Sequence, residues 1–278
     1  MTSHSPNQRF YDTTEVVEIF ASGEALFQAE ETIIASLQDE IRDKPMLELG
    51  VGAGRVTPLV TALSKDYVGA DSSPKMIDKC RQRFGDARFL VCDARRMPIF
   101  ESDSFAAVFF FWNGIDEVSP PDRILILREV RRVLKPNGVF VFSSHNLDWE
   151  DIPAYALTEF WARRNPLAFV RGNAMRLRAF VSAFLAKRRS RRHDGFAVIP
   201  EYEEALHLLV PRYFIRKEAQ VEQLLETGFS EIEAFAAEGA VLDSRNRGAD
   251  HLVYYVARKA ESAAAADTGQ SHVTSLSA

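Results

Sequence analysis

The segment Met46-Leu-Glu-Leu-Gly50-Val-Gly52-Ala-Gly54-Arg55 determines the fold of this 278-residue chain. Its apolar beginning predicts a short buried strand, and its three alternate glycines predict a sharp turn that leads into a helix. Glycine adopts backbone conformations that other residues avoid, and it leaves no Cβ between the main chain and a ligand. The turn therefore predicts a site where a bound cofactor touches the backbone, beside the free N–H groups that open a helix.

A doubly wound, mostly parallel sheet is predicted around this segment. Short apolar runs alternate with helical patterns of about ten residues or more, which is typical of parallel strands joined by crossover helices. After the opening strand, strands are expected at 67–70, 88–92, 105–112 and 139–143, and helices at 55–64, 74–84 and 121–134. A later helix at 216–227 and strands at 229–236 and 251–257 bring the sheet to seven strands with helices on both faces.

Other segments decorate this core. Residues 1–43 are expected to form a short tail and an N-terminal helical cap, and residues 44–258 to form the main domain. Residues 147–212 interrupt the strand–helix alternation and are predicted to be a helical insertion that covers the open face of a cleft. The tail at 259–278 lacks a packing pattern and is expected to be disordered.

Composition excludes several classes of protein. The net charge is −5 and the pI about 5.8, so the chain as a whole is not built to bind nucleic acid. Cys80 and Cys92 lack partners for a disulfide framework or a zinc site, and no metal is expected. The longest apolar run, 105–112, is far shorter than the roughly 20 residues that span a bilayer. The first nine residues lack an apolar signal core, so a cytoplasmic location is expected.

An acidic residue marks the kind of cofactor. Asp71 ends the second predicted strand, whose carboxyl end adjoins the glycine turn, so it can accept hydrogen bonds from both hydroxyls of a bound ribose. The dinucleotide fingerprint requires a third glycine where Arg55 stands. Glu48 further disfavours a diphosphate. The site therefore suits an adenosine-type ligand with a zwitterionic or cationic tail.

Four further motifs follow at the ends of successive elements. Together with the glycine turn and Asp71-Ser72, they make the chain resemble the class I S-adenosylmethionine-dependent methyltransferases, in their small-molecule branch. Cys92-Asp93-Ala94 resembles the position that binds the adenine amino group, and Met76 resembles the apolar residue on the adenine face. Residues 109–116 take the place of the fourth motif, and residues 128–138 resemble the helix and turn before strand five.

The resemblance implies a Rossmann-like fold, S-adenosyl-L-methionine as the cofactor, and transfer of its methyl group by in-line displacement to a small molecule, most often at a hydroxyl oxygen. No metal or covalent intermediate is implied. The cofactor-binding residues that it implies are Tyr11, Glu48, Gly50, Gly52, Gly54, Arg55, Asp71, Ser72, Met76, Asp93, Ala94, Trp112 and Asn113.

For three residues the sequence leaves two possible roles open. His145 follows strand five and is the candidate catalytic base for a hydroxyl acceptor; the alternative is a turn histidine bonded to local backbone. Asn113 and Asp116 lie on the same rim, where they either hold the methionine moiety or the acceptor, or stabilise a turn. Residues 109–116 lack the Asp/Asn-Pro-Pro-Tyr pattern of nucleobase-methylating relatives, so no nucleic acid partner is expected.

The insertion contains a predicted basic amphipathic helix. Residues 163–192 include ten Lys and Arg, and the apolar residues between them recur at helical spacing: Leu177, Phe180, Val181, Phe184 and Leu185. Such a helix covers a core with a solvated face, lies on an anionic membrane, or receives an acidic or lipid-linked acceptor. The polar and aromatic residues beyond it would suit the wall of an acceptor pocket: His193, Tyr202, His207 and Tyr213.

Two other classes of function stay open at this level. A nicotinamide-dependent oxidoreductase would use the same fold, although Arg55 and Glu48 count against it. A non-catalytic protein that keeps the cofactor fold would instead contact a membrane or a partner through the basic helix.

Overall fold

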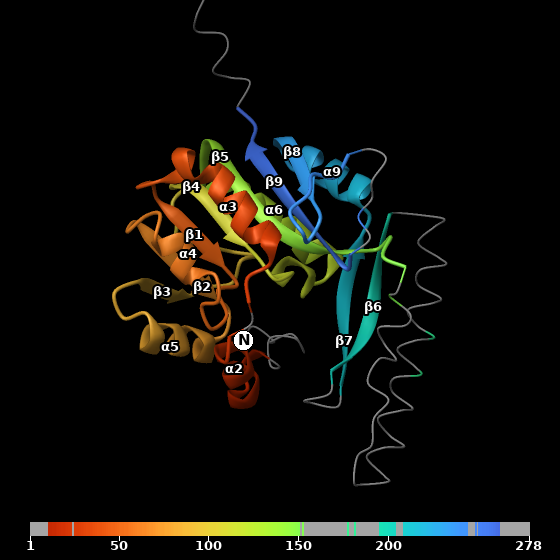
Figure 1. Cartoon of the computed structure of the whole chain (residues 1–278), viewed down its shortest axis with the longest axis horizontal. Helices are drawn as coiled ribbons and strands as arrows, with labels where there is room; N and C mark the ends of the chain where they lie inside the picture. Colours follow the sequence, from red (N-terminus) through yellow and green to blue (C-terminus); the bar gives the residue numbers. More distant parts are fainter. Residues whose placement is uncertain are drawn as a thin grey trace, which may run out of the picture.

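The central feature of the structure, a computed structural model, is a twisted sheet (Figure 1). The structure describes residues 11–23, 25–150, 152, 177, 181, 195–203, 208–243, 248 and 250–261. Five parallel strands lie in the order β3-β2-β1-β4-β5. Their bounds are Met46–Leu49 for β1, Tyr67–Asp71 for β2, Arg88–Val91 for β3, Phe105–Phe110 for β4 and Leu134–Asn146 for β5. From β1 the chain adds strands first toward one edge of the sheet (β2, β3) and then toward the other (β4, β5). Doubly wound sheets bind ligands at this switch point, between β1 and β4.

Two more strands, joined through antiparallel pairs, complete the predicted seven. Strand β9 (Leu252–Lys259) pairs with β5, and β8 (Phe229–Phe235) pairs with β9. The predicted Rossmann-like class and its mostly parallel core are confirmed.

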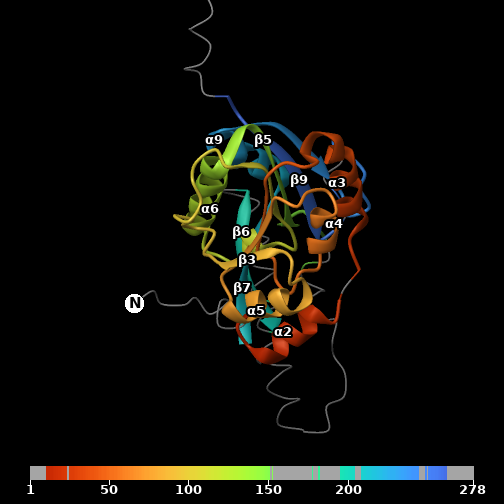
Figure 2. The same cartoon turned by 90° about the vertical axis from the view of Figure 1, so that its left-hand side faces the viewer.

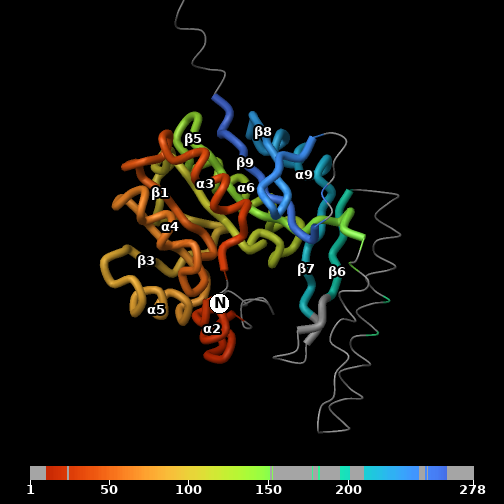
Figure 3. Tube along the Cα trace, in the orientation of Figure 1, coloured from red at the N-terminus to blue at the C-terminus, as the bar shows by residue number. Residues whose placement is uncertain are grey.

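The insertion adds a β-hairpin that the sequence analysis does not predict. Strands β6 (Phe196–Glu203) and β7 (Leu208–Ile215) pair with each other, and β7 runs parallel to the end of β5 through the pairs His145–Phe214 and Asn146–Ile215. Figure 3 shows the hairpin projecting from the carboxyl end of β5. The insertion is therefore not all helical, because its last part extends the sheet to nine strands within the described residues.

Helices cover both faces of the sheet (Figure 2). Helices α3 (Gln28–Ile41), α4 (Thr57–Thr61) and α5 (Pro74–Arg83) pack on one face, where Ile33 and Ile77 are fully buried. Helices α6 (Pro120–Val133) and α9 (Lys217–Glu226) pack on the other, with Leu127 and Leu224 fully buried. Each such side chain contributes roughly 1.5–3 kcal/mol by leaving water.

The predicted helical cap divides into two parts. Helix α2 (Thr14–Ala21) lies at the carboxyl ends of the strands, where Val16 and Val17 pack with Met76 of α5. Helix α3 instead packs on the sheet. Ser73 caps α5 by accepting a hydrogen bond from the Met76 N–H at 3.3 Å, as the Ser73-Pro74 pair predicts. The cap fixes α5 directly beside the end of β2.

Several predictions concern segments outside the described residues. These are the first eight residues, the tail beyond Glu261, and all ten basic residues of the predicted amphipathic helix. Leu177 and Val181 are described in that segment; both are helical, and they are 57% and 45% exposed. Within the described residues, no helix is both long and apolar enough to cross a bilayer.

Gly54 offers a test of the glycine turn. Its φ is +85°, and a Cβ there would lie 2.3 Å from Cε2 of Phe84. Gly23 has a similar φ of +81° with nothing within 4 Å of its Cβ position. We expect Gly54→Ala to lower the free energy of unfolding in urea by about 2–4 kcal/mol, and the matched control Gly23→Ala by about 1–2 kcal/mol, the strain alone. Equal losses would show that the turn has room for a side chain.

Candidate functional site

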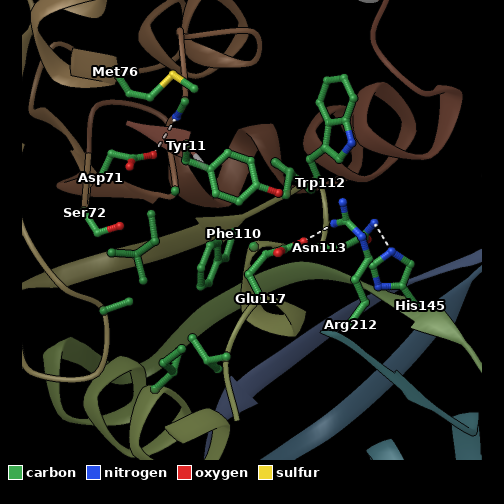
Figure 4. A pocket seen from close by; sticks show the side chains of 18 of the residues that line it. Tyr11, Asp71, Ser72, Met76, Phe110, Trp112, Asn113, Glu117, His145 and Arg212 are labelled. Carbon is green, nitrogen blue, oxygen red and sulfur yellow. Dashed lines mark hydrogen bonds and ion pairs between the residues drawn. The ribbon is translucent and has the colours of Figure 1, made fainter. Parts of the chain in front are cut away.

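A cavity of about 340 Å³ opens at the carboxyl ends of the parallel strands. This volume lies within the usual range of roughly 300–1,000 Å³ for small-molecule sites. Figure 4 shows Asp71, Ser72 and Met76 toward one end, and Asn113, His145 and Arg212 toward the other. Tyr11 lies between the two groups. The cavity therefore has two ends that different elements build.

The glycine turn forms part of the first end. Gly50 and Gly52 line the cavity and have φ values of +56° and +54°. A Cβ on Gly52 would meet only the Phe20 ring, at 3.6 Å, so the side of the turn that faces the cavity is open. The Gly52 N–H donates to Asp71 at 3.0 Å. The backbone of the turn is thus exposed to a ligand and held by the acid beside it.

Asp71 is fixed at the end of β2 by main-chain donors. Its carboxylate accepts hydrogen bonds from the Gly52 N–H and, at 2.8 Å, from the Ser73 N–H. Burial raises the pKa of Asp71, and the N–H donors of Ser73 and Gly52 partly offset that rise. A carboxylate held in this way in the cavity wall is suited to accept hydrogen bonds from neutral hydroxyls, such as those of a ribose.

The rest of this end is apolar and acidic. Met76 is buried in the wall formed with α2, and Ala94 lines the cavity beside Asp93. Partial burial acts to raise the pKa of Asp93, but the Arg95 guanidinium, 2.6 Å away, holds it below its usual value. Asp93 therefore stays ionised and can accept a hydrogen bond from an amino group.

A strained turn separates the two ends. Trp112 and Asn113 have φ values of +52° and +56°, the left-handed conformation that is unfavourable for residues other than glycine. The Asn113 N–H donates to the Ser143 hydroxyl at 3.0 Å, which holds the turn against β5. Strain of this kind persists only where surrounding contacts hold it, and it often accompanies function.

His145 lies at the second end, in the cavity wall. Its Nδ1 is 2.8 Å from Oδ2 of Asp116, and its backbone N–H donates to the same oxygen at 2.7 Å. Because a carboxylate only accepts, Nδ1 carries the proton and the Nε2 lone pair is available. The Asn113 amide nitrogen lies 3.2 Å from Nε2 and donates to it. The alternative of a turn histidine bonded only to local backbone is not what the structure shows.

Asp116 lies behind His145 instead of in the cavity. Asp116 and Arg123 have no exposed side-chain surface, and they form an ion pair. Arg123 also donates to the backbone oxygen of Ile115 at 3.2 Å and to the Ser144 hydroxyl at 3.1 Å. Contact with a ligand, one of the roles predicted for Asp116, does not fit this buried position, in which its carboxylate accepts hydrogen bonds from His145.

Three predicted cofactor residues do not line this cavity. Gly54 packs on Phe84. Glu48 points into the core, where the hydroxyls of Tyr67 and Thr57 donate to its Oε2 at 2.5 and 3.0 Å. Their role is to build the turn and the strand that carry the cavity wall.

Arg55 is the third of these residues. It forms a bidentate ion pair with the buried Glu30, both contacts 2.6 Å long, and its guanidinium lies 4.6 Å from the centre of the Trp112 ring. Its side chain therefore supports Trp112 from behind instead of reaching the cavity.

The structure brings in residues that sequence reasoning misses. Glu117 and Arg212 form an ion pair, and the hydroxyl of Tyr11 hydrogen-bonds to both. Tyr11 lies in the segment before α2, Glu117 directly follows η1 (Gly114–Asp116), and Arg212 lies on β7. Aromatic and imidazole rings complete the wall: Phe27, Phe111, Trp149, Phe214 and His251. No spacing in the sequence relates these residues, because they meet only through the fold.

Of the residues predicted to form an acceptor wall, only Tyr213 has a described side chain. Tyr213 is buried away from the cavity, stacked on Phe196 with ring centres 5.0 Å apart. His193 and His207 lie outside the described residues, as does the side chain of Tyr202. Within the described residues, no group of three or more His, Cys, Asp or Glu is arranged to hold a metal ion. Cys80 and Cys92 are free thiols, and burial raises the pKa of Cys92 to about 11.

Comparison with known proteins agrees with this geometry. Residues 46–138 match a family model described as a methyltransferase domain. A segment of 106 residues is 35% identical to the demethylmenaquinone methyltransferase of Thermotoga maritima, covering 37% of this chain and 44% of that protein. The chain spans less than half the length of the curated relatives that it matches.

Solved structures share the fold over most of the chain. The CcbJ methyltransferase of Streptomyces caelestis superposes with a TM-score of 0.58 at 18% identity, covering 92% of this chain and all of that one. A Burkholderia thailandensis N-methyltransferase, solved with 1,6-didemethyltoxoflavin and S-adenosylhomocysteine, superposes with a TM-score of 0.50 at 15% identity, covering 84% and 77%.

Residues 46–138 therefore match a methyltransferase domain, and the chain has the Rossmann-like fold of the S-adenosylmethionine-dependent methyltransferase family to which it is similar. The cofactor that this family implies fits the first end of the cavity. Asp71 offers a carboxylate to hydroxyls, Asp93 offers one to an amino group, and the open side of Gly52 leaves room beside the backbone. The sequence argument that Glu48 disfavours a pyrophosphate is not supported, because its carboxylate accepts hydrogen bonds from Tyr67 and Thr57 in the core.

Glu48 supplies a test of how the turn is built. Burial raises its pKa from 4.5 to about 7, against the hydrogen bonds from Tyr67 and Thr57. Between these pH values the folded state binds more protons than the unfolded state, so this group makes the protein less stable as the pH rises.

We expect Glu48→Gln, whose carbonyl oxygen keeps both hydrogen bonds, to be as stable as the parent below about pH 4.5. By pH 8 it gains about 3 kcal/mol in free energy of unfolding, at roughly 1.4 kcal/mol per pH unit. Urea unfolding across this pH range measures the difference, with exposed Glu31→Gln as the control. The same pH dependence in Glu48→Gln and the parent would mean that Glu48 is ionised throughout.

Proposed function

We propose that this protein transfers a methyl group from S-adenosyl-L-methionine to a hydroxyl oxygen of a small molecule. One observation carries the proposal: a single cavity joins the adenosine-suited end at Asp71 to an oriented histidine, His145. Binding at the first end would place the cofactor's reactive group toward the second.

The first end supplies binding. In this proposal Asp71 and Ser72 hold the ribose, Met76 packs on the adenine, and Asp93 and Ala94 contact its amino group. The methionine moiety is held by Gly50, Gly52, Tyr11 and Trp112. When bound, the cofactor supplies an electrophilic methyl group on a sulfonium. The protein's contribution is to hold the acceptor in line with that group and to exclude water.

The second end supplies the base. In the reaction the acceptor hydroxyl replaces the Asn113 amide as the donor to Nε2 of His145, and Nε2 takes the proton that the hydroxyl releases as it becomes a nucleophile. Asp116 holds the ring by its Nδ1–H and stabilises the imidazolium that forms. Arg123 fixes the position of Asp116 by pairing with it in the protein interior.

The relatives support a small-molecule acceptor. The curated relative is named for demethylmenaquinone, and the Burkholderia enzyme was solved with 1,6-didemethyltoxoflavin. A lipid-linked acceptor and peripheral membrane contact are further proposals that rest on the basic residues at 163–192, and a cytoplasmic location is one that rests on the lack of an apolar signal core. An acidic acceptor, which the same basic residues allow, is the less favoured case because the charges at the second end already pair with one another. Capture of methyl-labelled product from fractionated extract of the source cells, followed by mass spectrometry, identifies the acceptor.

Substitution of Asp71 tests the identity of the cofactor. We expect S-adenosylhomocysteine to bind the protein with micromolar affinity in calorimetry, and Asp71→Ala to weaken this binding at least tenfold, because the ribose loses its acceptor. Asp78→Ala, an exposed change on α5, is the matched control and keeps full affinity. Binding of NADH without binding of S-adenosylhomocysteine would instead support an oxidoreductase. Binding of neither would support the non-catalytic reading.

Substitution of His145 tests whether this residue acts as the catalytic base. With the acceptor identified, we expect His145→Gln to lower turnover by roughly 10²-fold or more and to leave the affinity for S-adenosylhomocysteine unchanged. An unchanged rate would reduce His145 to a structural residue.

A further inference from the structure

An unsatisfied polar atom lies at the second end of the cavity. Asn113 lines the cavity and is only 5% exposed, and its amide oxygen Oδ1 is buried with no hydrogen-bond donor among the described residues. A buried carbonyl without a donor is unfavourable, and native proteins leave few of them. The atom therefore marks a position where a ligand donor belongs.

The orientation of the Asn113 amide is determined by its neighbours. Asp116 accepts from Nδ1 of His145, so Nε2 has a lone pair, and only the amide nitrogen of Asn113 can donate to it. The oxygen must then point away from His145. The sequence leaves Asn113 open between the methionine moiety and the acceptor, and its place beside His145 favours the acceptor.

The wall around this end is made of flat side chains. The ring of Phe214 lies 4.8 Å from that of His145, and the ring of Trp149 lies 5.6 Å from that of His251. Phe27 and Phe111 line the same cavity. Aromatic faces contact flat, conjugated molecules over a larger area than flexible chains, in offset or edge-on arrangements.

The charges at this end are compensated. Glu117 and Arg212 pair with each other, and Asp116 pairs with Arg123. A charged acceptor would have to break one of these pairs to find a partner, so this end suits an uncharged group.

From these observations we infer that the acceptor is a flat, uncharged, conjugated ring compound with a hydroxyl or N–H donor on its edge. Asn113 Oδ1 accepts the hydrogen bond from that donor, which is a group on the edge of the ring beside the hydroxyl that reacts at His145. The inference rests on the proposed methyl transfer and adds to it the class of acceptor and the residue that selects it.

Three probes test this class by calorimetry on protein saturated with S-adenosylhomocysteine. 2-Naphthol is flat and has a donor, 2-methoxynaphthalene is flat without a donor, and decahydro-2-naphthol has a donor without a flat ring. We expect 2-naphthol to bind at least tenfold more tightly than either of the others. Equal binding of 2-naphthol and either comparison probe, or no binding of any probe, overturns the inference.

Two variants assign the effect to Asn113. Asn113→Gly tolerates the positive φ and removes the amide, so the advantage of 2-naphthol over 2-methoxynaphthalene should fall below about threefold. Asn113→Asp tolerates the same φ and keeps an acceptor oxygen, so the advantage should return. An advantage that persists in Asn113→Gly overturns the assignment. The affinity for S-adenosylhomocysteine is measured separately on each protein, and its loss in the parent would reject the proposed function instead.

Discussion

The buried ion pair between Arg123 and Asp116 is the interaction on which the second end of the cavity depends. Neither side chain is exposed, and two charges inside a protein are stable only when they are paired and hydrogen-bonded. Arg123 meets this condition through Asp116, Ser144 and the Ile115 carbonyl. Removing one partner of such a pair typically costs about 3–5 kcal/mol, because the other charge is left buried.

This pair also connects elements that are far apart in the chain. Arg123 comes from α6 and also donates to Gln220 and Gln223 of α9. Its guanidinium lies 4.7 Å from the centre of the Tyr213 ring on β7. The insertion hairpin, the last helix and the histidine in the cavity wall are therefore held by one side chain. A binding site made of loops and an insertion gains its rigidity from this buried centre.

The parts of the site that could be predicted lie at the ends of strands. Asp71, Asp93 and His145 each follow or end an apolar run, and parallel strands bring their carboxyl ends to one edge of the sheet. Glu48 could not be judged in the same way. It lies within β1, where side chains alternate between opposite faces, and its carboxylate points into the core to meet Tyr67. Arg55 likewise finds Glu30 of α3, a partner 25 positions away.

The sequence by itself determined the strand–turn–helix at 46–61 and the alternation of strands and helices that makes the sheet mostly parallel, because these depend on local turn residues and on the periodicity of apolar side chains. Only the tertiary structure decided the second end. The pairing of β7 with β5 brings Arg212 and Phe214 to Glu117 and His145, and the strained turn at Asn113 leaves an amide oxygen buried without a donor among the described residues. These contacts join residues separated by about 30 to 100 positions, so no local pattern encodes them.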